Sequence, residues 1–414
     1  MMRASAILSI AIPLGVMGAV GPGAGPACDP DNGGLTLPRD FCAVVVADRV
    51  GGARHIAVAA NGDLYVALQS GEFGSGGVIA LRDTNGDGKA DIIQPIGSEG
   101  GSGIALDGQS LYFSTPSTVY RYALHAGRLA PVGPPDVIVR NLPSTGHGAR
   151  SLALSTDGRL LFVNVGSRTN SCQRSDRDTE SPGRDPCVEL DTRAGIWQFD
   201  AGKQGQTQRD GLRFATGIRN AVALAVNPAD GLLYSVVHGR DQLGQNWPHL
   251  YTLAQSAEKP SEEFIQISRG DDFGWPYCYH DPELGYLVLA PEYDGDGKKV
   301  DRCAAKKEPL LAFPGHWAPN GLLFYSGRQF PARFQGGAFI AFHGSWNRAP
   351  FPQAGFRVVF VPFSSGKPAG GYETFADGFR PGHRPVGLAQ GPDGSLYITD
   401  DAAGRIWRVM YKGR

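Results

Sequence analysis

The chain is predicted to be all-β, a six-bladed β-propeller of four-stranded blades with disulfide-stapled loop insertions. Three observations predict this fold. Six times along 414 residues, a short apolar stretch runs into Gly and a second apolar stretch, usually with an aromatic residue, leaves it. Gly (58 residues) and Pro (30 residues) punctuate the whole length, and no stretch has sustained helical periodicity. A spacing of about 45–50 residues between copies is typical of propeller blades.

Each copy is expected to form strand, tight turn and strand. The copies cover, in order, residues 56–68, 103–114, 151–165, 221–237, 321–345 and 386–400. Their turn glycines are Gly62, Gly108, Gly158, Gly231, Gly337 and Gly394. The gaps after copies three and four are the longest and each contains a Cys pair, which predicts an insertion in each of these blades. Residues 28–50 are expected to close the ring by pairing with the last blade.

The first 27 residues are predicted to be a secretory signal peptide. Arg3 supplies a positive charge, residues 4–20 are almost free of polar groups, and small residues follow through Ala27. Residues 28–414 are then expected to form one catalytic propeller domain in a periplasmic or secreted protein. No later segment is long and apolar enough to span a bilayer, so the chain is not expected to be membrane-spanning.

Six cysteines follow the predicted signal: Cys28, Cys42, Cys172, Cys187, Cys278 and Cys303. An even count in an exported chain indicates disulfides. Pairing of sequence neighbours, 28–42, 172–187 and 278–303, is the simplest of fifteen connectivities. The spacing contains neither CxxC nor CxxCH, which argues against thiol redox chemistry, a zinc–thiolate site and covalently bound haem.

Charge and motif content argue against two further classes of function. The formal net charge is −1 and there is no long basic run, so nucleic acid is not an expected partner. No GxGxxG follows a strand and precedes a helix, so a Rossmann-bound nicotinamide is not supported.

Basic residues stand directly before several repeat strands. His55 precedes copy one, His147 copy three, Arg219 copy four and Arg384 copy six. In a propeller this segment lies beside the central channel, so we expect these side chains in one pocket. A neutral His can take a proton from a hydroxyl, and an adjacent Arg can stabilise an anion that forms on an acceptor oxygen. These His and Arg residues suit oxidation of an alcohol or hemiacetal by hydride transfer. The alternative interpretation is that each Arg forms an ion pair with a carboxylate between blades.

Five ordered segments together resemble the glucose/sorbosone dehydrogenase family, especially its sorbosone and pyranose dehydrogenase branch. They are GIRNAVALAVNP (217–228), HGRDQLG (238–244), DDFGWPYCYHD (271–281), FHGSWNR (342–348) and RPVGLAQGPDGSLYITDD (384–401). The family consists of six-bladed quinoproteins that use pyrroloquinoline quinone (PQQ) with Ca²⁺. The resemblance implies an exported oxidoreductase that oxidises the C1 hydroxyl or aldehyde of a sugar (aldose, sorbosone or pyranose). Electrons would pass to a separate acceptor, a soluble cytochrome or the membrane quinone pool, because the chain has no haem motif.

The resemblance also implies roles for single residues. His147 matches the catalytic base, and Arg219 the residue that contacts the hydride-accepting quinone carbonyl. The cofactor-binding positions are Asn220, Arg384, His343 and Arg348. The calcium beside the quinone would take the backbone carbonyls of Gly239 and Arg240, with Asp241 as a further candidate. Gly146 stands where soluble glucose dehydrogenases have Asp, which argues against glucose itself as the substrate.

A second candidate calcium site is structural. Asp83, Asn85, Asp87 and Asp91 alternate with glycines as in the first half of a calcium-binding loop. Gln94 stands where that loop would have its bidentate Glu. A plain Asx-rich hairpin is the alternative interpretation.

Two other functions remain open from the sequence. One is a calcium-dependent propeller hydrolase of the lactonase type, which needs carboxylates and Asn side chains that converge on the channel. The other is a non-catalytic sugar- or protein-binding propeller that has lost the cofactor.

Overall fold

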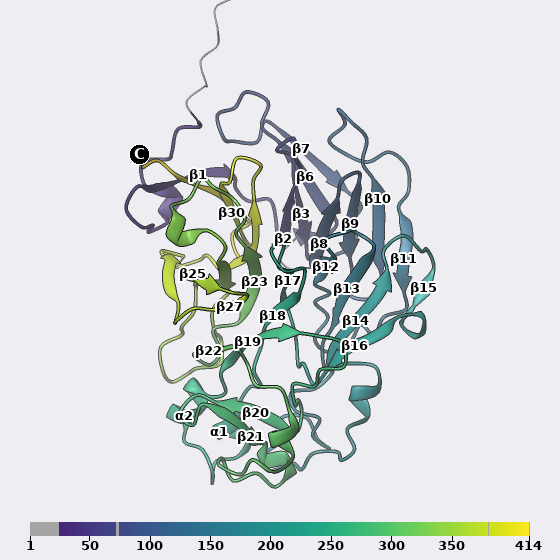
Figure 1. The fold of residues 1–414 in the computed structure, drawn as a ribbon, viewed down its shortest axis with the longest axis vertical. Helices are drawn as coiled ribbons and strands as arrows, with labels where there is room; N and C mark the ends of the chain where they lie inside the picture. Colours follow the sequence, from purple (N-terminus) through teal and green to yellow (C-terminus); the bar gives the residue numbers. More distant parts are fainter. Residues whose placement is uncertain (1–24, 72–73, 380, 414) are drawn as a thin grey trace, which may run out of the picture.

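The computed structural model describes residues 25–71, 74–379 and 381–413, so all but the last three residues of the predicted signal peptide lie outside the described residues. The described chain forms six antiparallel sheets of four consecutive or nearly consecutive strands (Figure 1). Each sheet is one blade. One blade carries an additional short strand, β15 (Gln206–Thr207), parallel to its outermost strand.

The strands of the blades follow the chain in order. Blade 1 consists of β2 (Ala53–Val58), β3 (Leu64–Leu68), β6 (Val78–Arg82) and β7 (Ile92–Ile96). Blade 2 consists of β8 (Gly103–Asp107), β9 (Ser110–Ser114), β10 (Val119–Ala123) and β11 (Asp136–Arg140). Blade 3 consists of β12 (Leu152–Leu154), β13 (Leu160–Val165), β14 (Gly195–Asp200) and β16 (Leu212–Thr216).

The remaining three blades repeat the pattern. Blade 4 consists of β17 (Ala223–Val226), β18 (Leu233–Val237), β19 (Glu262–Ile267) and β22 (Leu311–Phe313). Blade 5 consists of β23 (Pro319–Phe324), β24 (Ala338–Phe342), β25 (Arg357–Val361) and β28 (Glu373–Ala376). Blade 6 consists of β29 (Pro385–Gln390), β30 (Leu396–Asp400), β31 (Ile406–Tyr411) and β1 (Phe41–Ala47).

The first strands of the blades form a closed ring. Each contacts the first strand of the next blade, in the order β2, β8, β12, β17, β23, β29 and back to β2. These strands and their hairpin partners coincide with the six sequence copies, so the predicted six-bladed propeller is confirmed. The turns at Gly62, Gly158 and Gly394 have φ of 91°, 70° and 87°, which Gly adopts without steric cost.

One predicted turn is wrong. β23 ends at Phe324 and β24 begins at Ala338, and a 3-10 turn, η6 (Ala332–Phe334), lies between them. Here the positive φ, 73°, belongs to Gly336 rather than Gly337. The longer connection buries Phe330 and Phe334 in the core between blades 5 and 6, so it is stabilised by apolar packing instead of a tight turn.

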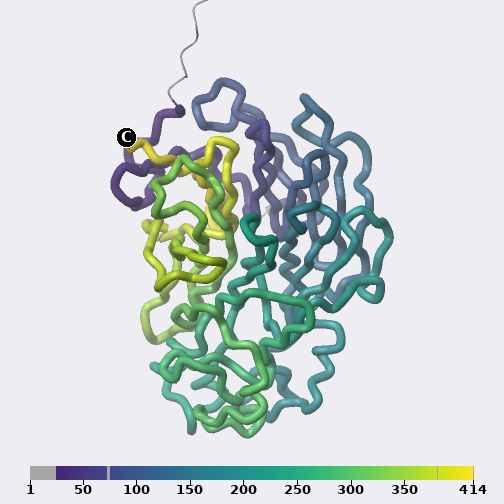
Figure 2. The backbone as a smooth tube through the Cα atoms, in the orientation of Figure 1, coloured from purple at the N-terminus to yellow at the C-terminus, as the bar shows by residue number. Residues whose placement is uncertain are grey.

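Ring closure joins the two ends of the described chain. β1 pairs antiparallel with β31, from Phe41 opposite Tyr411 to Ala47 opposite Ile406. Figure 2 shows the purple N-terminal segment and the yellow C-terminal segment side by side. This confirms the predicted role of residues 28–50.

The insertions gather at one end of the molecule. A loop between β13 and β14 contains the Cys172–Cys187 disulfide, and the connection from β19 to β22 contains Cys278–Cys303. The second connection folds as the hairpin β20 (Cys278–Asp281) and β21 (Tyr286–Leu289), which lies near α1 (Leu243–Asn246) and α2 (Leu253–Glu258) at the lower end of Figure 1. With Cys28–Cys42, the three predicted disulfides are all present.

Short elements complete the fold. Two small hairpins are β4 (Ser70–Gly71) with β5 (Gly74–Ser75), and β26 (Phe363–Ser364) with β27 (Lys367–Pro368). The other 3-10 turns are η1 (Asn32–Gly34), η2 (Val188–Asp191), η3 (Gln208–Asp210), η4 (Pro291–Tyr293) and η5 (Asp301–Ala305). Among the described residues, no helix has the length and apolar character needed to cross a membrane.

The aromatic cluster between blades 5 and 6 supports a test of the fold. Phe339 is fully buried and its ring contacts five others: Tyr325, Phe330, Phe334, Phe360 and Phe375. Phe339→Ala leaves a cavity there, so we expect the free energy of unfolding to fall by about 3–5 kcal/mol in urea titrations. Phe351→Ala, at a position 39% exposed, is the matched control. Equal effects of the two substitutions would contradict this packing.

Candidate functional site

A cavity of about 470 Å³ lies where the first strands of the blades begin. Because each blade opens with an antiparallel hairpin, the start of its first strand and the end of its second meet at this end. Four arginines, four histidines, three asparagines and two acidic residues contribute to the lining. They are Arg54, Arg177, Arg219, Arg384, His147, His238, His316, His343, Asn220, Asn320, Asn347, Asp241 and Glu262.

Most of the residues predicted for the site line this cavity. They are His147, Arg219, Asn220, Gly239, Asp241, His343 and Arg384. They come from blades 3, 4, 5 and 6, as the position of basic residues before the repeat strands predicts. His55 points instead into the central channel below, where its Nε2 contacts the Asn320 carbonyl oxygen at 2.7 Å.

His147 is held as a neutral imidazole with one free nitrogen. Its Nδ1 lies 2.9 Å from the carbonyl oxygen and 3.0 Å from the hydroxyl oxygen of Ser167. The Ser167 hydroxyl donates to the Thr169 carbonyl, so both Ser167 oxygens can only accept, and Nδ1 carries the proton. Burial, with the nearby Arg219, lowers the pKa of His147 to about 3. Nε2 therefore keeps its lone pair, and it has no protein partner within the described residues.

The other histidines of the cavity differ from His147 in this respect. His238 Nε2 lies 2.8 Å from the Pro319 carbonyl oxygen, and His316 Nε2 lies 2.8 Å from that of Ser256. His343 Nε2 lies 2.8 Å from Asp401 Oδ1. In each of these three rings, Nε2 already has a hydrogen-bond partner in the protein. His147 is therefore the histidine of this set that can accept a proton at Nε2.

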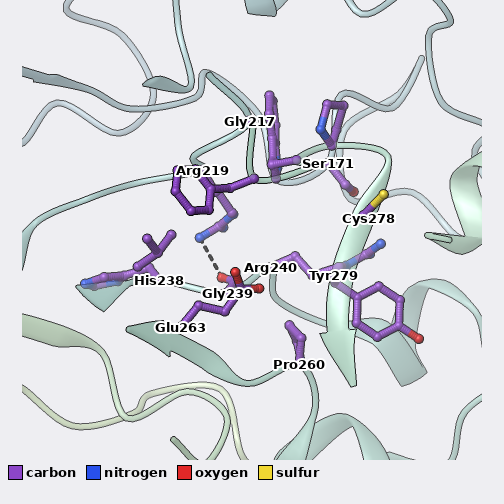
Figure 3. A pocket seen from close by; sticks show the side chains of 14 residues that line it. Ser171, Gly217, Arg219, His238, Gly239, Arg240, Pro260, Glu263, Cys278 and Tyr279 are labelled. Carbon is purple, nitrogen blue, oxygen red and sulfur yellow. Dashed lines mark hydrogen bonds between the residues drawn. The ribbon is translucent and has the colours of Figure 1, made fainter. Parts of the chain in front are cut away.

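Arg219 is fixed at the base of the cavity and keeps one donor. Its Nε and Nη2 bond the carbonyl and side-chain oxygens of Asn170 at 3.1 and 3.0 Å. Its Nη1 bonds the Gly239 carbonyl at 2.8 Å (Figure 3), and Nη2 also bonds Asp241 Oδ2 at 2.9 Å. A guanidinium has five N–H groups, so one on Nη1 remains. A rigid cation with a spare donor suits an oxygen that gains negative charge.

Asp241 holds two arginines in place. Its Oδ2 accepts from Arg219 Nη2 and from Arg177 Nη2, both at 2.9 Å, and its Oδ1 accepts from Asn347 Nδ2 at 2.8 Å. Burial alone would raise the pKa of Asp241, but Arg219 and Arg177 hold it well below the usual range of a carboxyl group. Asp241 is therefore an ionised structural anion, which leaves the rest of the cavity with an excess of positive charge.

Glu262 joins two loops at the cavity wall. Its carboxyl accepts from Gly239 N at 2.8 Å and from Ala318 N at 3.0 Å, which fixes the loop after β18 against the segment entering β23. Burial outweighs these hydrogen bonds and raises the pKa of Glu262 to about 7.

Arg384 and His343 connect the last blades around the cavity. Arg384 Nε donates to the His343 carbonyl at 3.1 Å, and its Nη2 contacts the Gly344 carbonyl. Asp401 binds His343 on one oxygen and Arg54 Nη1 on the other, the latter at 2.6 Å. The predicted cofactor-binding pair is thus positioned by blades 5, 6 and 1 together.

Two predicted residues are not brought to the cavity. Arg348 is buried elsewhere, where its guanidinium contacts the Ala257 carbonyl, the Gly315 carbonyl and the Glu258 carboxylate. The side chain of Arg240 pairs with Glu292 and faces a separate cavity of about 30 Å³, shown in Figure 3. Arg348 Nε also donates to the Pro352 carbonyl at 3.1 Å, so its guanidinium is engaged outside the lining of this cavity, and its role in cofactor binding stays a prediction.

Neither predicted calcium site is assembled by protein carboxylates. In the described part of the chain, no group of three or more His, Cys, Asp or Glu side chains could hold a metal ion. In the 83–91 loop, Asp83 accepts from the backbone of Gly86 and Gly88, and Asp91 accepts from Thr84. Asn85 and Asp87 likewise accept from loop backbone, a pattern that fits the Asx-rich hairpin, and the structural calcium stays a prediction.

Several residues of the site were not predicted. His238 and Asn347 stand within the quoted segments 238–244 and 342–348, and Arg54 directly precedes His55, so adjacency to a motif was the available signal. Arg177 had no such signal, because it lies in the insertion between Cys172 and Cys187, outside the repeats.

The residues present fit an anionic, carboxylate-bearing cofactor such as PQQ. Four arginines surround the cavity, and guanidinium groups bind carboxylates with matched geometry. In addition, the buried Asn347 Oδ1 has no protein partner and can accept a hydrogen bond from a ligand. Calcium fits less well, because Asp241 is already shared by two arginines and the Gly239 carbonyl by one.

The comparisons with known proteins show the family and the fold of this chain. A family model described as TrAA12-like matches residues 35–412. A pyrroloquinoline quinone-dependent sugar dehydrogenase of Hypocrea jecorina is 25% identical, over 90% of this chain and 85% of its own length. An uncharacterised protein of Borreliella burgdorferi is 27% identical, and the match spans 64% of this chain and 61% of that relative. The holo PQQ domain of the Coprinopsis cinerea pyranose dehydrogenase has the same fold, with a TM-score of 0.74 and 20% identity over 94% of this chain and 98% of that one.

The raised pKa of Glu262 generates a test by pH. Between its ordinary pKa of 4.5 and about 7, the folded state binds a proton that the unfolded state has lost. Stability from this group is therefore full below pH 4.5 and falls as pH rises to 7, by about 3 kcal/mol. Glu262→Gln should make this slope shallower by about that amount in urea titrations from pH 4 to 8, while Glu263, whose pKa burial raises to about 8, keeps its own contribution. Glu373→Gln, at a half-exposed position, should keep it; an unchanged slope in Glu262→Gln would contradict the assignment.

Proposed function

Because the chain belongs to the TrAA12-like family, we propose that it is a PQQ-dependent sugar dehydrogenase that oxidises the C1 hydroxyl or aldehyde of an aldose, sorbosone or other pyranose. The observation that carries this proposal is the neutral His147, whose free Nε2 shares one cavity with the spare donor of Arg219 and three further arginines. PQQ, when bound, supplies the two-electron acceptor for the hydride.

The protein residues supply proton transfer, orientation and stabilisation of charge. His147 Nε2 takes the proton from the sugar hydroxyl, so that the hydride can leave from the same carbon. Ser167 fixes the ring and its tautomer. Arg219 keeps an N–H directed at an oxygen that gains negative charge, and Asp241 with Asn170 holds that guanidinium rigid.

Other residues of the cavity bind the cofactor in this proposal. Arg384, together with Arg219 and Arg177, which share the single carboxylate of Asp241, balances its carboxylates, and Asn220 and Asn347 supply neutral hydrogen-bonding groups. The Gly239 and Arg240 carbonyls would hold calcium, if it binds, because Asp241 is committed to arginines. We derive no catalytic step from the metal.

Location and partners follow from the same proposal. Three disulfides and the predicted signal peptide support an exported protein. Electrons would leave to a separate acceptor, a soluble cytochrome or the membrane quinone pool. A lactonase-type hydrolase is disfavoured, because the two acidic residues of the cavity are tied to arginines or backbone N–H groups.

Reconstitution tests the proposal. Purified protein is mixed with PQQ and Ca²⁺, and dye reduction is followed with a panel of aldoses, pyranoses and sorbosone. We expect dye reduction with at least one sugar and only when PQQ is present. In calorimetry, Ca²⁺ should bind together with PQQ and give no binding heat alone. Absence of both PQQ binding and dye reduction would leave the non-catalytic propeller, and PQQ-independent lactone hydrolysis would favour the hydrolase.

The role of His147 has its own test. His147→Gln removes the proton acceptor at Nε2, so we expect kcat to fall by about 10²–10⁴-fold while the Kd for PQQ stays within a few fold. Because the imidazole is already neutral above about pH 3, the wild-type kcat/KM should show no acidic limb from this residue between pH 5 and 7. Equal loss of turnover and PQQ binding would mean that His147 is a scaffold residue.

A further inference from the structure

A second cavity of about 280 Å³ adjoins the site through shared residues. Arg54, Gly148 and Ala149 line both cavities, and the latter two directly follow His147 in the chain. The second cavity is otherwise formed by blades 1 and 2, which contribute none of the predicted catalytic or cofactor-binding residues. It therefore adjoins the segment that carries the proposed base, and neither Arg219 nor Asp241 lines it.

Backbone rather than side chains forms one wall of the second cavity. A Cβ at Gly100 would lie 2.3 Å from Ser70 Oγ and 2.4 Å from Ser70 N, and one at Gly101 would lie 2.1 Å from the Ser114 carbonyl oxygen. No larger residue fits at either position without movement of the backbone. Gly100 and Gly101 therefore let this wall pack directly against Ser70 and Ser114.

Two polar side chains of the second cavity are uncommitted. The backbone there is fixed, since Gln69 N donates to Gly52 O at 3.0 Å and Gly101 N donates to Leu68 O at 2.9 Å. Within the described residues, however, the Gln69 amide and the Ser70 hydroxyl make no hydrogen bond to the protein. Together they offer donors and acceptors suited to the hydroxyls of a ligand.

The charge at this wall is balanced. Arg54 is the ionisable residue of the second cavity, and its Nη1 pairs with Asp401 Oδ2 at 2.6 Å. A neutral, hydroxyl-rich ligand matches this lining better than an anion, in contrast to the arginine-rich first cavity.

We propose that the second cavity binds the hydroxyls of a neutral sugar that do not react, and that Gln69 and Ser70 determine sugar specificity. This assignment rests on the proposed function, because it places the rest of the sugar beside His147. Either the far side of one pyranose ring or a second sugar residue supplies these hydroxyls.

Kinetics of the PQQ-loaded enzyme test the subsite. Gln69→Ala should raise KM about three- to tenfold for sugars that reach the cavity, with kcat nearly unchanged, because it removes binding common to ground and transition states. Ser70→Ala should act in the same direction. Gln109→Ala, at an exposed position on the turn between β8 and β9, is the matched control and should change neither parameter. The Kd for PQQ should be the same in all variants.

The sugar panel identifies the source of the hydroxyls. A KM increase with monosaccharides places a single ring across both cavities, whereas an increase confined to disaccharides places a second residue in the subsite. Unchanged KM for every sugar in both Gln69→Ala and Ser70→Ala would overturn the proposal.

Direct binding separates this proposal from the proposed function. If the wild type binds PQQ but oxidises no sugar, the proposed function fails, and calorimetric titration of the same sugars still tests the subsite. Sugar binding weakened three- to tenfold by Gln69→Ala supports the subsite in that case. Absence of any sugar binding to the wild type, or equal binding by wild type and Gln69→Ala, overturns it.

Discussion

Closure of the ring by β1 and β31 is the constraint on which the rest of the structure depends. Blade 6 takes three strands from the end of the described chain and its fourth from the beginning. Without that strand, the apolar face of β31 and the Phe cluster around Phe41 would be exposed to water. The cavity draws side chains from five blades, so it exists only while the six first strands form a complete ring.

Within the ring, two carboxylates position basic side chains of the site. Asp241 holds Arg219 and Arg177 together, and Asp401 holds His343 and Arg54. Each carboxylate fixes two basic groups, so the guanidinium groups are positioned before any ligand arrives. Burial, and after it the charge of Arg219, disfavours protonation of His147, which keeps the proposed base neutral. The two carboxylates thus act indirectly, through the cations that they position.

The sequence predicts the repetitive part of this molecule well and the irregular part poorly. The hairpins β2–β3 and β29–β30 follow from alternating apolar residues around one Gly, and His147 and Arg219 follow from their place before such hairpins. The tight turn predicted between β23 and β24 is wrong, because Phe330 and Phe334 stabilise a longer connection there by long-range packing. Asn347 rather than Arg348 lines the cavity. Neighbouring side chains in a loop point in different directions, and no sequence periodicity predicts which of them points into the cavity. Arg177 could not be foreseen, because the position of an insertion over the ring is a tertiary property.

The position of Arg177 links assembly of the cavity to the redox state of one cysteine pair. This side chain lies inside the loop that the Cys172–Cys187 disulfide closes, and it supplies one of the two cations on Asp241. In the reduced chain nothing covalent would restrain that loop, and Asp241 would lose the restraint on one of its partners. Oxidation of this cysteine pair would therefore precede a fully formed cavity, so assembly of the proposed cofactor site depends on the redox state of the chain.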